Sequence, residues 1–93
     1  MQKVDQDPFF EGLGYERFEM EYIYGIYVCY RGPDGGFYRI DHFDSSYVIE
    51  FAENENEARI GRFEDTDTFP DDLPFEELKK QMNEWFDTYV AND

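Results

Sequence analysis

The acidic stretch at 64–77 (EDTDTFPDDLPFEE) is the densest group of side chains that could do chemistry. It holds seven carboxylates and no basic residue. Asp65 and Asp67 occupy the first and third positions of a calcium-loop pattern, so a cation site is the first hypothesis. Such loops need an oxygen ligand at the fifth position and glycine at the sixth, where this chain has Phe69 and Pro70. The pattern fails where its geometry is strictest, and we expect no metal site.

Helix initiation accounts for the second half of this stretch. Asp71 or Asp72 is placed to cap a following helix, and Pro74 suits its first turn. Glu76 and Glu77 lie in that turn, where carboxylates meet the positive end of the helix dipole. The first half has no such local explanation, which leaves the carboxylates of Glu64, Asp65 and Asp67.

His42 and Cys29 are the only residues of their kinds and the natural candidates for catalysis. Strand alternation would place His42 beside Asp44, but a nucleophile from Ser45 or Ser46 would have to fold back over its own strand. Cys29 lies in the most apolar part of the sequence, with no lysine beside it to lower its pKa. We therefore expect no catalytic residue, no cofactor and no enzymatic activity.

The charge of the chain limits its partners. Its 23 acidic and 8 basic residues give a formal net charge of −15. Such a field repels nucleic acid and anionic membranes and attracts basic proteins. Aromatic residues make up 20% of the chain, which is more than disordered acidic chains contain. Selection for salt tolerance across a proteome would be another cause of the acidity.

Alternating apolar residues predict the first element, a long strand from Phe18 to Tyr30. Gly25 interrupts it, and we interpret this glycine as a bulge or bend. A helix over 14–22 is the competing interpretation, because Glu, Arg and Met favour helices. Before the strand, Asp7, Pro8 and Gly12 predict a short N-terminal helical turn.

Two turn signals follow the long strand. The sequence at 31–36 (RGPDGG) predicts a hairpin leading into a strand over 37–43, and the sequence at 44–46 predicts a tight turn into a strand over 47–51. The segment at 52–57 is too polar to pair stably, and 58–63 is interpreted as the fourth strand. Together these elements predict an antiparallel meander at 15–63.

A C-terminal amphipathic helix over 72–90 is the last predicted element. Its apolar residues recur every three or four positions: Phe75, Leu78, Met82, Trp85, Phe86 and Tyr89. The predicted fold is therefore α+β: a four-stranded antiparallel meander, covered on one face by this helix, with a helical turn within 1–14. We expect one domain over 1–93, and with a single cysteine and no signal sequence we expect it in the cytoplasm.

These features suggest a small acidic protein-binding module, an inhibitor or immunity-type protein with a basic partner that itself handles nucleic acid. Nuclease immunity proteins and phage nucleic-acid mimics are similar in size and charge, although no motif assigns the chain to either group. Alternatives are a structural or homodimeric domain, and less favourably a small carboxylate-based enzyme or ligand binder. The expected contact residues are the carboxylates that local structure does not require and the surplus tyrosines: Glu50, Glu53, Glu55, Glu57, Glu64, Asp65, Asp67, Tyr22, Tyr24, Tyr38 and Tyr47.

Overall fold

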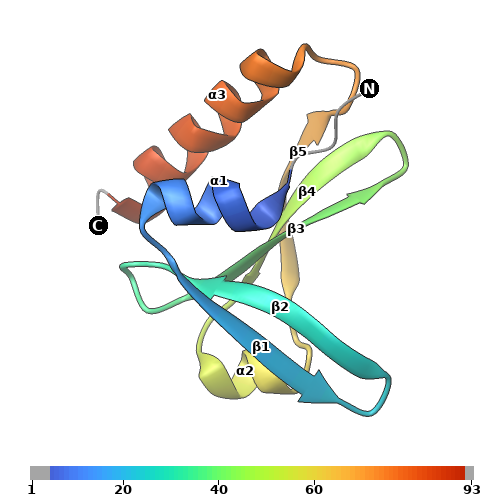
Figure 1. The fold of residues 1–93 in the computed structure, drawn as a ribbon, viewed down its shortest axis with the longest axis vertical. Helices are drawn as coiled ribbons and strands as arrows, with labels where there is room; N and C mark the ends of the chain where they lie inside the picture. Colours follow the sequence, from blue (N-terminus) through green and yellow to red (C-terminus); the bar gives the residue numbers. More distant parts are fainter. Residues whose placement is uncertain (1–4, 92–93) are drawn as a thin grey trace.

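The computed structural model describes residues 5–91, without the side chain of Tyr22. Figure 1 shows an α+β fold in which five strands form one open antiparallel sheet of order β1-β2-β3-β4-β5. The elements are α1 (Gln6–Leu13), β1 (Glu16–Tyr22), β2 (Gly25–Arg31), β3 (Phe37–Phe43), β4 (Ser46–Ala52), α2 (Glu55–Arg59), β5 (Glu64–Pro70), α3 (Phe75–Phe86) and a π-helical turn (Asp87–Ala91). The predicted α+β class, antiparallel sheet and C-terminal helix are confirmed, but the predicted number of four strands is wrong.

The predicted long strand is two strands, β1 and β2, joined by a tight turn at Ile23 and Tyr24. They pair from Glu16↔Arg31 to Tyr22↔Gly25, so Gly25 begins a new strand and is not a bulge. This register pairs even with odd residues, and the even apolar positions of the two strands therefore lie on opposite faces of the sheet. The apolar residues at even positions continue through the turn because β2 is apolar on both faces. The sequence pattern therefore does not show that the chain reverses direction there.

The segment after β4 also differs from the prediction. Residues 58–63 do not form a strand, because the short helix α2 occupies 55–59 and is capped by Asn54, whose side chain accepts from the backbone N–H of Glu57 at 2.9 Å. The fifth strand, β5, is the first half of the acidic stretch. It lies at an edge of the sheet with only Phe69 buried, so it lacks the apolar alternation that marks a half-buried strand.

Helix α3 begins at Phe75, later than predicted, and no side chain caps it. The predicted caps, Asp71 and Asp72, do not cap it: Pro74 holds the N-cap position, and the carboxylate of Asp71 lies 2.8 Å from Nε2 of His42. Part of the predicted apolar stripe of α3 is buried, namely Leu78, Met82 and Phe86, while Phe75 and Trp85 are partly buried. The helix ends at Phe86, earlier than predicted, and Tyr89 in the π-helical turn beyond it is 62% exposed.

Helix α1 is longer than the predicted turn. Gly12 lies inside it, and Gly14 ends it in the left-handed conformation with φ 80°. Asp7 is within the helix and does not cap it; its carboxylate accepts hydrogen bonds from the hydroxyl of Tyr30 and from Arg17. These two hydrogen bonds, that from Tyr30 foremost, lower the pKa of Asp7.

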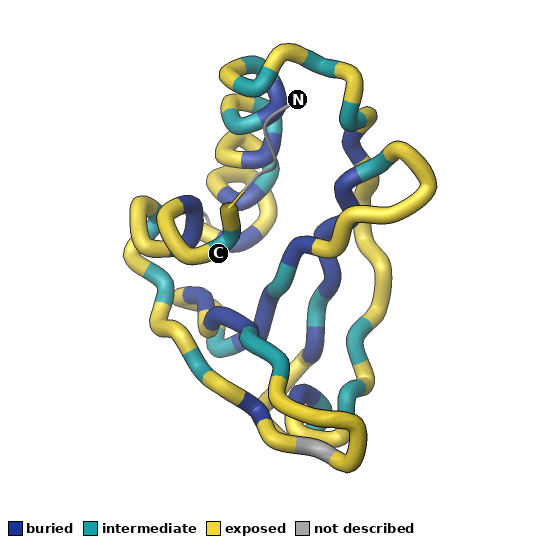
Figure 2. Tube along the Cα trace, turned by 45° about the vertical axis from the view of Figure 1, so that its right-hand side comes forward, coloured by how far each residue is buried: buried dark blue, intermediate teal, exposed yellow. Residues whose placement is uncertain are grey.

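The buried side chains form two clusters, one on each face of the sheet. Helices α1 and α3 cover the first face, where Phe10 stacks on Tyr30 with ring centroids 4.3 Å apart and Phe86 meets Phe10 edge-on at 5.3 Å. Helix α2 covers part of the second face through Ala58. Figure 2 shows these buried segments beside the exposed outer end of the β1–β2 hairpin. No helix within residues 5–91 is long and apolar enough to cross a bilayer.

The sheet is uneven in its pairing. Strands β1 and β2 pair along seven residues, as do β3 and β4, but β2 and β3 are paired only at Tyr30↔Tyr38 and Arg31↔Phe37. Beyond this point the two hairpins diverge, and the β1–β2 hairpin extends away from the rest of the sheet (Figure 1). In the diverging region, Oε1 of Gln6 accepts from the backbone N–H of Ile40 at 2.9 Å and takes the place of a strand partner.

Candidate functional site

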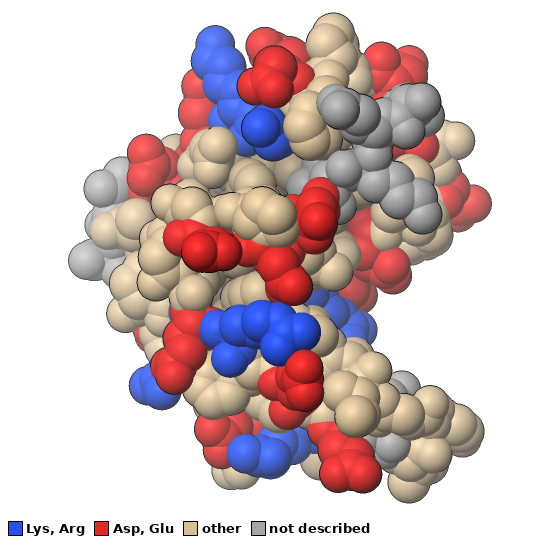
Figure 3. Space-filling view, in the orientation of Figure 1, with Lys and Arg blue, Asp and Glu red and all other residues tan. Residues whose placement is uncertain are grey.

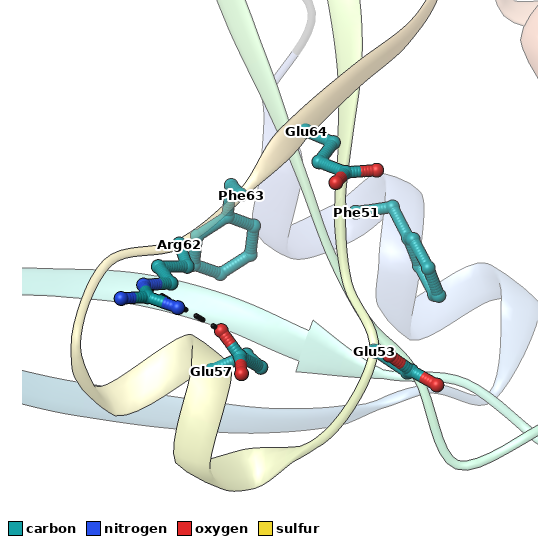
Figure 4. A pocket seen from close by; sticks show the side chains of 6 residues that line it. All are labelled: Phe51, Glu53, Glu57, Arg62, Phe63 and Glu64. Carbon is teal, nitrogen blue, oxygen red and sulfur yellow. Dashed lines mark ion pairs between the residues drawn. The ribbon is translucent and has the colours of Figure 1, made fainter.

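A hollow of about 490 Å³ lies where β4 ends, α2 turns the chain and β5 begins. Three carboxylates, one guanidinium and two phenyl rings line it, as Figure 4 shows: Glu53, Glu57, Glu64, Arg62, Phe51 and Phe63. The side chains come from positions separated by at most thirteen residues, so the α2 connection alone gathers them. We name this feature the acidic hollow.

The local sequence explains why the chain folds into this shape. Asn54 caps α2, and Glu55 pairs with Arg59 one turn later at 3.2 Å. The buried Ala58 holds the helix against the sheet, and Gly61 with φ 76° reverses the chain toward β5. The cap at Asn54 and the turn at Gly61 thus bound a short helix, which places Glu57 beside the start of β5.

The acidic hollow is electrostatically unbalanced. Its one cation, Arg62, lies 3.9 Å from Glu57 and is largely exposed, so this ion pair is weak. Within residues 5–91, Glu53 and Glu64 have no ion pair, and both are exposed. Two uncompensated carboxylates beside phenyl rings form a surface that suits the side chain of lysine or arginine.

The same chemistry already holds a cation inside the protein. The guanidinium carbon of Arg39 lies 4.1 Å from the ring centroid of Phe63 and 5.2 Å from that of Tyr27. Nε of Arg39 donates to Glu50 at 2.9 Å. Burial raises the pKa of Glu50, and the neighbouring Arg39 opposes that shift. The ring of Phe63 therefore contacts the guanidinium of Arg39 and also lines the acidic hollow.

The other predicted contact carboxylates have different surroundings. Glu50 is buried against Arg39, so its charge is compensated inside the fold. Glu55 pairs with Arg59 on α2, and Asp67 accepts a hydrogen bond from Trp85. Asp65 is exposed opposite Glu50 on β5. The structure therefore brings together three of the seven predicted carboxylates: Glu53, Glu57 and Glu64.

The predicted tyrosines do not form one surface. Tyr38 and Tyr47 are buried core residues, the first donating to Asp34 and the second stacked on His42. Tyr24 is exposed at the turn of the β1–β2 hairpin. The side chain of Tyr22 lies outside the described part of the structure.

The two candidate catalytic residues are placed as follows. His42 stacks on Tyr47, with centroids 4.2 Å apart, and pairs with Asp71 rather than with the predicted Asp44. Cys29 is buried, and this burial raises its pKa to about 11, which disfavours the reactive thiolate. Within residues 5–91, no group of three His, Cys, Asp or Glu side chains is arranged so that it could hold a metal ion, and this includes the three carboxylates of the acidic hollow.

Sequence reasoning missed the apolar and basic parts of the acidic hollow: Phe51, Arg62 and Phe63. Phe51 and Phe63 were placed on predicted strands, where alternation accounts for large rings without assigning them to a site. The cap at Asn54 was the signal that could have revealed α2, because Asn followed three residues later by Glu is typical of a helix start.

Comparisons with known proteins do not add to this picture. The chain matches no family model, and neither curated proteins nor solved structures gave a significant match.

Proposed function

We propose that this protein is an acidic protein-binding module that inhibits or sequesters a basic protein by receiving its lysine or arginine side chains in the acidic hollow. The observation that supports it is the lining of the hollow: three carboxylates and two phenyl rings around one weakly paired arginine. A guanidinium from a partner would gain charge-assisted hydrogen bonds and contact with the rings.

The net charge assists the encounter. A molecule with a charge of −15 attracts a basic protein before contact and speeds association, and salt screens this attraction. Figure 3 shows acidic side chains spread over the face in view, with fewer basic ones between them. The general field therefore steers the partner, and the acidic hollow supplies the local fit.

A basic protein that handles nucleic acid is the partner class that this proposal favours. Such proteins present clustered lysine and arginine side chains to phosphates, and closely spaced carboxylates compete for the same groups. An acidic chain that occupies this surface would block nucleic-acid binding without contacting nucleic acid itself.

Affinity capture from the host lysate at low and high salt tests the proposal. We expect a basic protein to be retained at low salt and lost as salt increases. The variant Glu53→Gln/Glu57→Gln/Glu64→Gln should retain much less of it, because each carboxylate loses its charge. The matched control is Glu11→Gln/Glu76→Gln/Glu84→Gln, which removes equal charge from exposed sites on α1 and α3.

Two results would reject the proposal. Equal capture by the hollow variant and the control would show that net charge alone, and not the hollow, retains the partner. A dimer that is indifferent to salt, with no retained partner, would favour the structural or dimeric alternative.

A further inference from the structure

The β1–β2 hairpin ends in a group of large apolar side chains that the fold leaves in solvent. Ile23 is 86% exposed, Tyr24 83% and Ile26 66%. Figure 3 shows this end as an arm projecting at the lower right of the molecule, where Figure 1 places the turn. We call these three side chains the hairpin tip.

Local structure does not require apolar residues at this turn. The β3–β4 turn of the same sheet uses Asp44 and Ser45, with φ 52° and 59°, as two-residue hairpin turns commonly do. In the β1–β2 turn only Gly25, with φ 132°, has a conformation that demands a particular residue. Polar residues at 23 and 24 would therefore serve the fold equally well, and exposed apolar groups of this kind mark contact sites.

The charges near the hairpin tip indicate the kind of surface it meets. The carboxylates of Glu19 and Glu21 lie on the strand that leads into the tip. Glu19 already pairs with Arg17 at 3.0 Å, whereas Glu21 has no ion pair among the described residues and lies opposite Ile26 across the hairpin. A second copy of this chain would bring like charges together, as would an anionic membrane. A protein cleft with an apolar floor and a basic rim matches both the apolar tip and the carboxylate of Glu21.

We propose that the hairpin tip inserts into an apolar, basic-rimmed cleft of the same partner that the acidic hollow binds. This inference rests on the proposed function in assigning both surfaces to one partner. Helix α2 packs against β1, so the acidic hollow and the hairpin lie at the same end of the molecule and one partner can cover both (Figure 1). The apolar contact would slow dissociation, whereas the hollow and the net charge would mainly speed association.

The probe for this inference is a random peptide library displayed on phage. We expect the wild-type protein to enrich peptides that combine aromatic or aliphatic residues with lysine or arginine. The variant Ile23→Ser/Tyr24→Ser/Ile26→Thr should bind those peptides about tenfold more weakly or worse, as hot-spot residues do. Asp44→Asn/Ser45→Gly is the matched control at the other turn and should bind as wild type does.

The possible negative results distinguish an error in this inference from an error in the proposed function. Peptides that need the three glutamates of the hollow but not the hairpin tip would overturn this inference and leave the proposed function intact. Absence of tip-dependent peptides would also overturn it. So would binding to neutral phosphatidylcholine vesicles that the tip variant loses, or a wild-type dimer that this variant loses. The single variant Ile23→Ser, placed in the turn, serves if the triple variant has a lowered melting temperature.

Discussion

The indole Nε1 of Trp85 lies 2.5 Å from Oδ2 of Asp67 and donates a hydrogen bond that ties α3 to the edge strand β5. Asp65, two residues earlier on the same strand, has no such contact among the described residues and faces Glu50 across the ladder. Two neighbouring aspartates of the acidic stretch therefore have different surroundings: Asp67 is held by Trp85, and Asp65 is exposed without such a contact.

We expect Asp67→Ala to lower the free energy of unfolding by about 1 kcal/mol through the lost hydrogen bond. Asp65→Ala should change it by less than about 0.5 kcal/mol, because it removes an exposed charge that faces another carboxylate. Urea denaturation followed by the fluorescence of the single tryptophan measures both. Equal losses in the two variants would contradict this division.

Asp71 and Asp72 are also neighbours that should contribute differently to stability. The carboxylate of Asp71 is 15% exposed and meets His42, whereas Asp72 is exposed and caps nothing. Asp71→Ala should lower the free energy of unfolding by about 1 kcal/mol, and Asp72→Ala should leave it nearly unchanged. A larger loss of stability in Asp72→Ala than in Asp71→Ala would indicate that Asp72 caps α3, contrary to the structure. Thermal unfolding of the two variants at neutral pH decides between these outcomes.

Removing the hydroxyls of Tyr15 and Tyr30 should change the free energy of unfolding in opposite directions. The buried hydroxyl of Tyr15 has no hydrogen-bond partner among the described residues, and its burial raises its pKa to about 12. Tyr15→Phe should therefore raise the free energy of unfolding by about 1 kcal/mol. Tyr30→Phe should lower it by about the same amount, because the hydroxyl of Tyr30 donates to Asp7. Chemical denaturation checks both, and a loss of stability in Tyr15→Phe would show that the buried hydroxyl of Tyr15 stabilises the fold after all.

Glu50 should make stability depend on pH in a recognisable direction. Burial raises the pKa of Glu50 in the folded protein above its ordinary value of 4.5, so the folded state holds this proton more tightly than the unfolded state. The stability of the wild type relative to Glu50→Gln should therefore fall as pH rises from about 4.5 through the raised pKa. Unfolding of both proteins across this range measures the difference. A relative stability that rises with pH would show that Arg39 outweighs the cost of burial.

The sequence predicted the elements whose burial produces a repeated pattern. The strand at 47–51 and the helix at Phe75–Phe86 were recognised because their apolar residues recur with the correct period, and the strand at 37–43 because the turn signal at 31–36 precedes it. Strand β5 was missed because an edge strand with one buried residue has no such period, and α2 is too short to show one. The turn at Ile23 and Tyr24 was missed because apolar residues are rare at such positions.

The candidate site was only partly predictable for a related reason. The seven carboxylates look alike in the sequence, and distant contacts decide which of them remain available. Glu50 is compensated by Arg39, eleven residues away, and Asp67 is held by Trp85, eighteen residues away. Neither pairing follows from local spacing, so composition indicated an acidic surface without locating the acidic hollow.

We propose that the acidic hollow receives a basic side chain. The most direct measurement is an NMR titration of the 15N-labelled protein with a short arginine peptide, compared with the same peptide containing citrulline, which has a similar shape and no charge. We expect amide shifts concentrated at Glu53, Glu57, Phe63 and Glu64, weakened by salt and absent both with citrulline and in Glu53→Gln/Glu57→Gln/Glu64→Gln. Shifts spread evenly over the acidic surface, or unchanged in that variant, would contradict the claim.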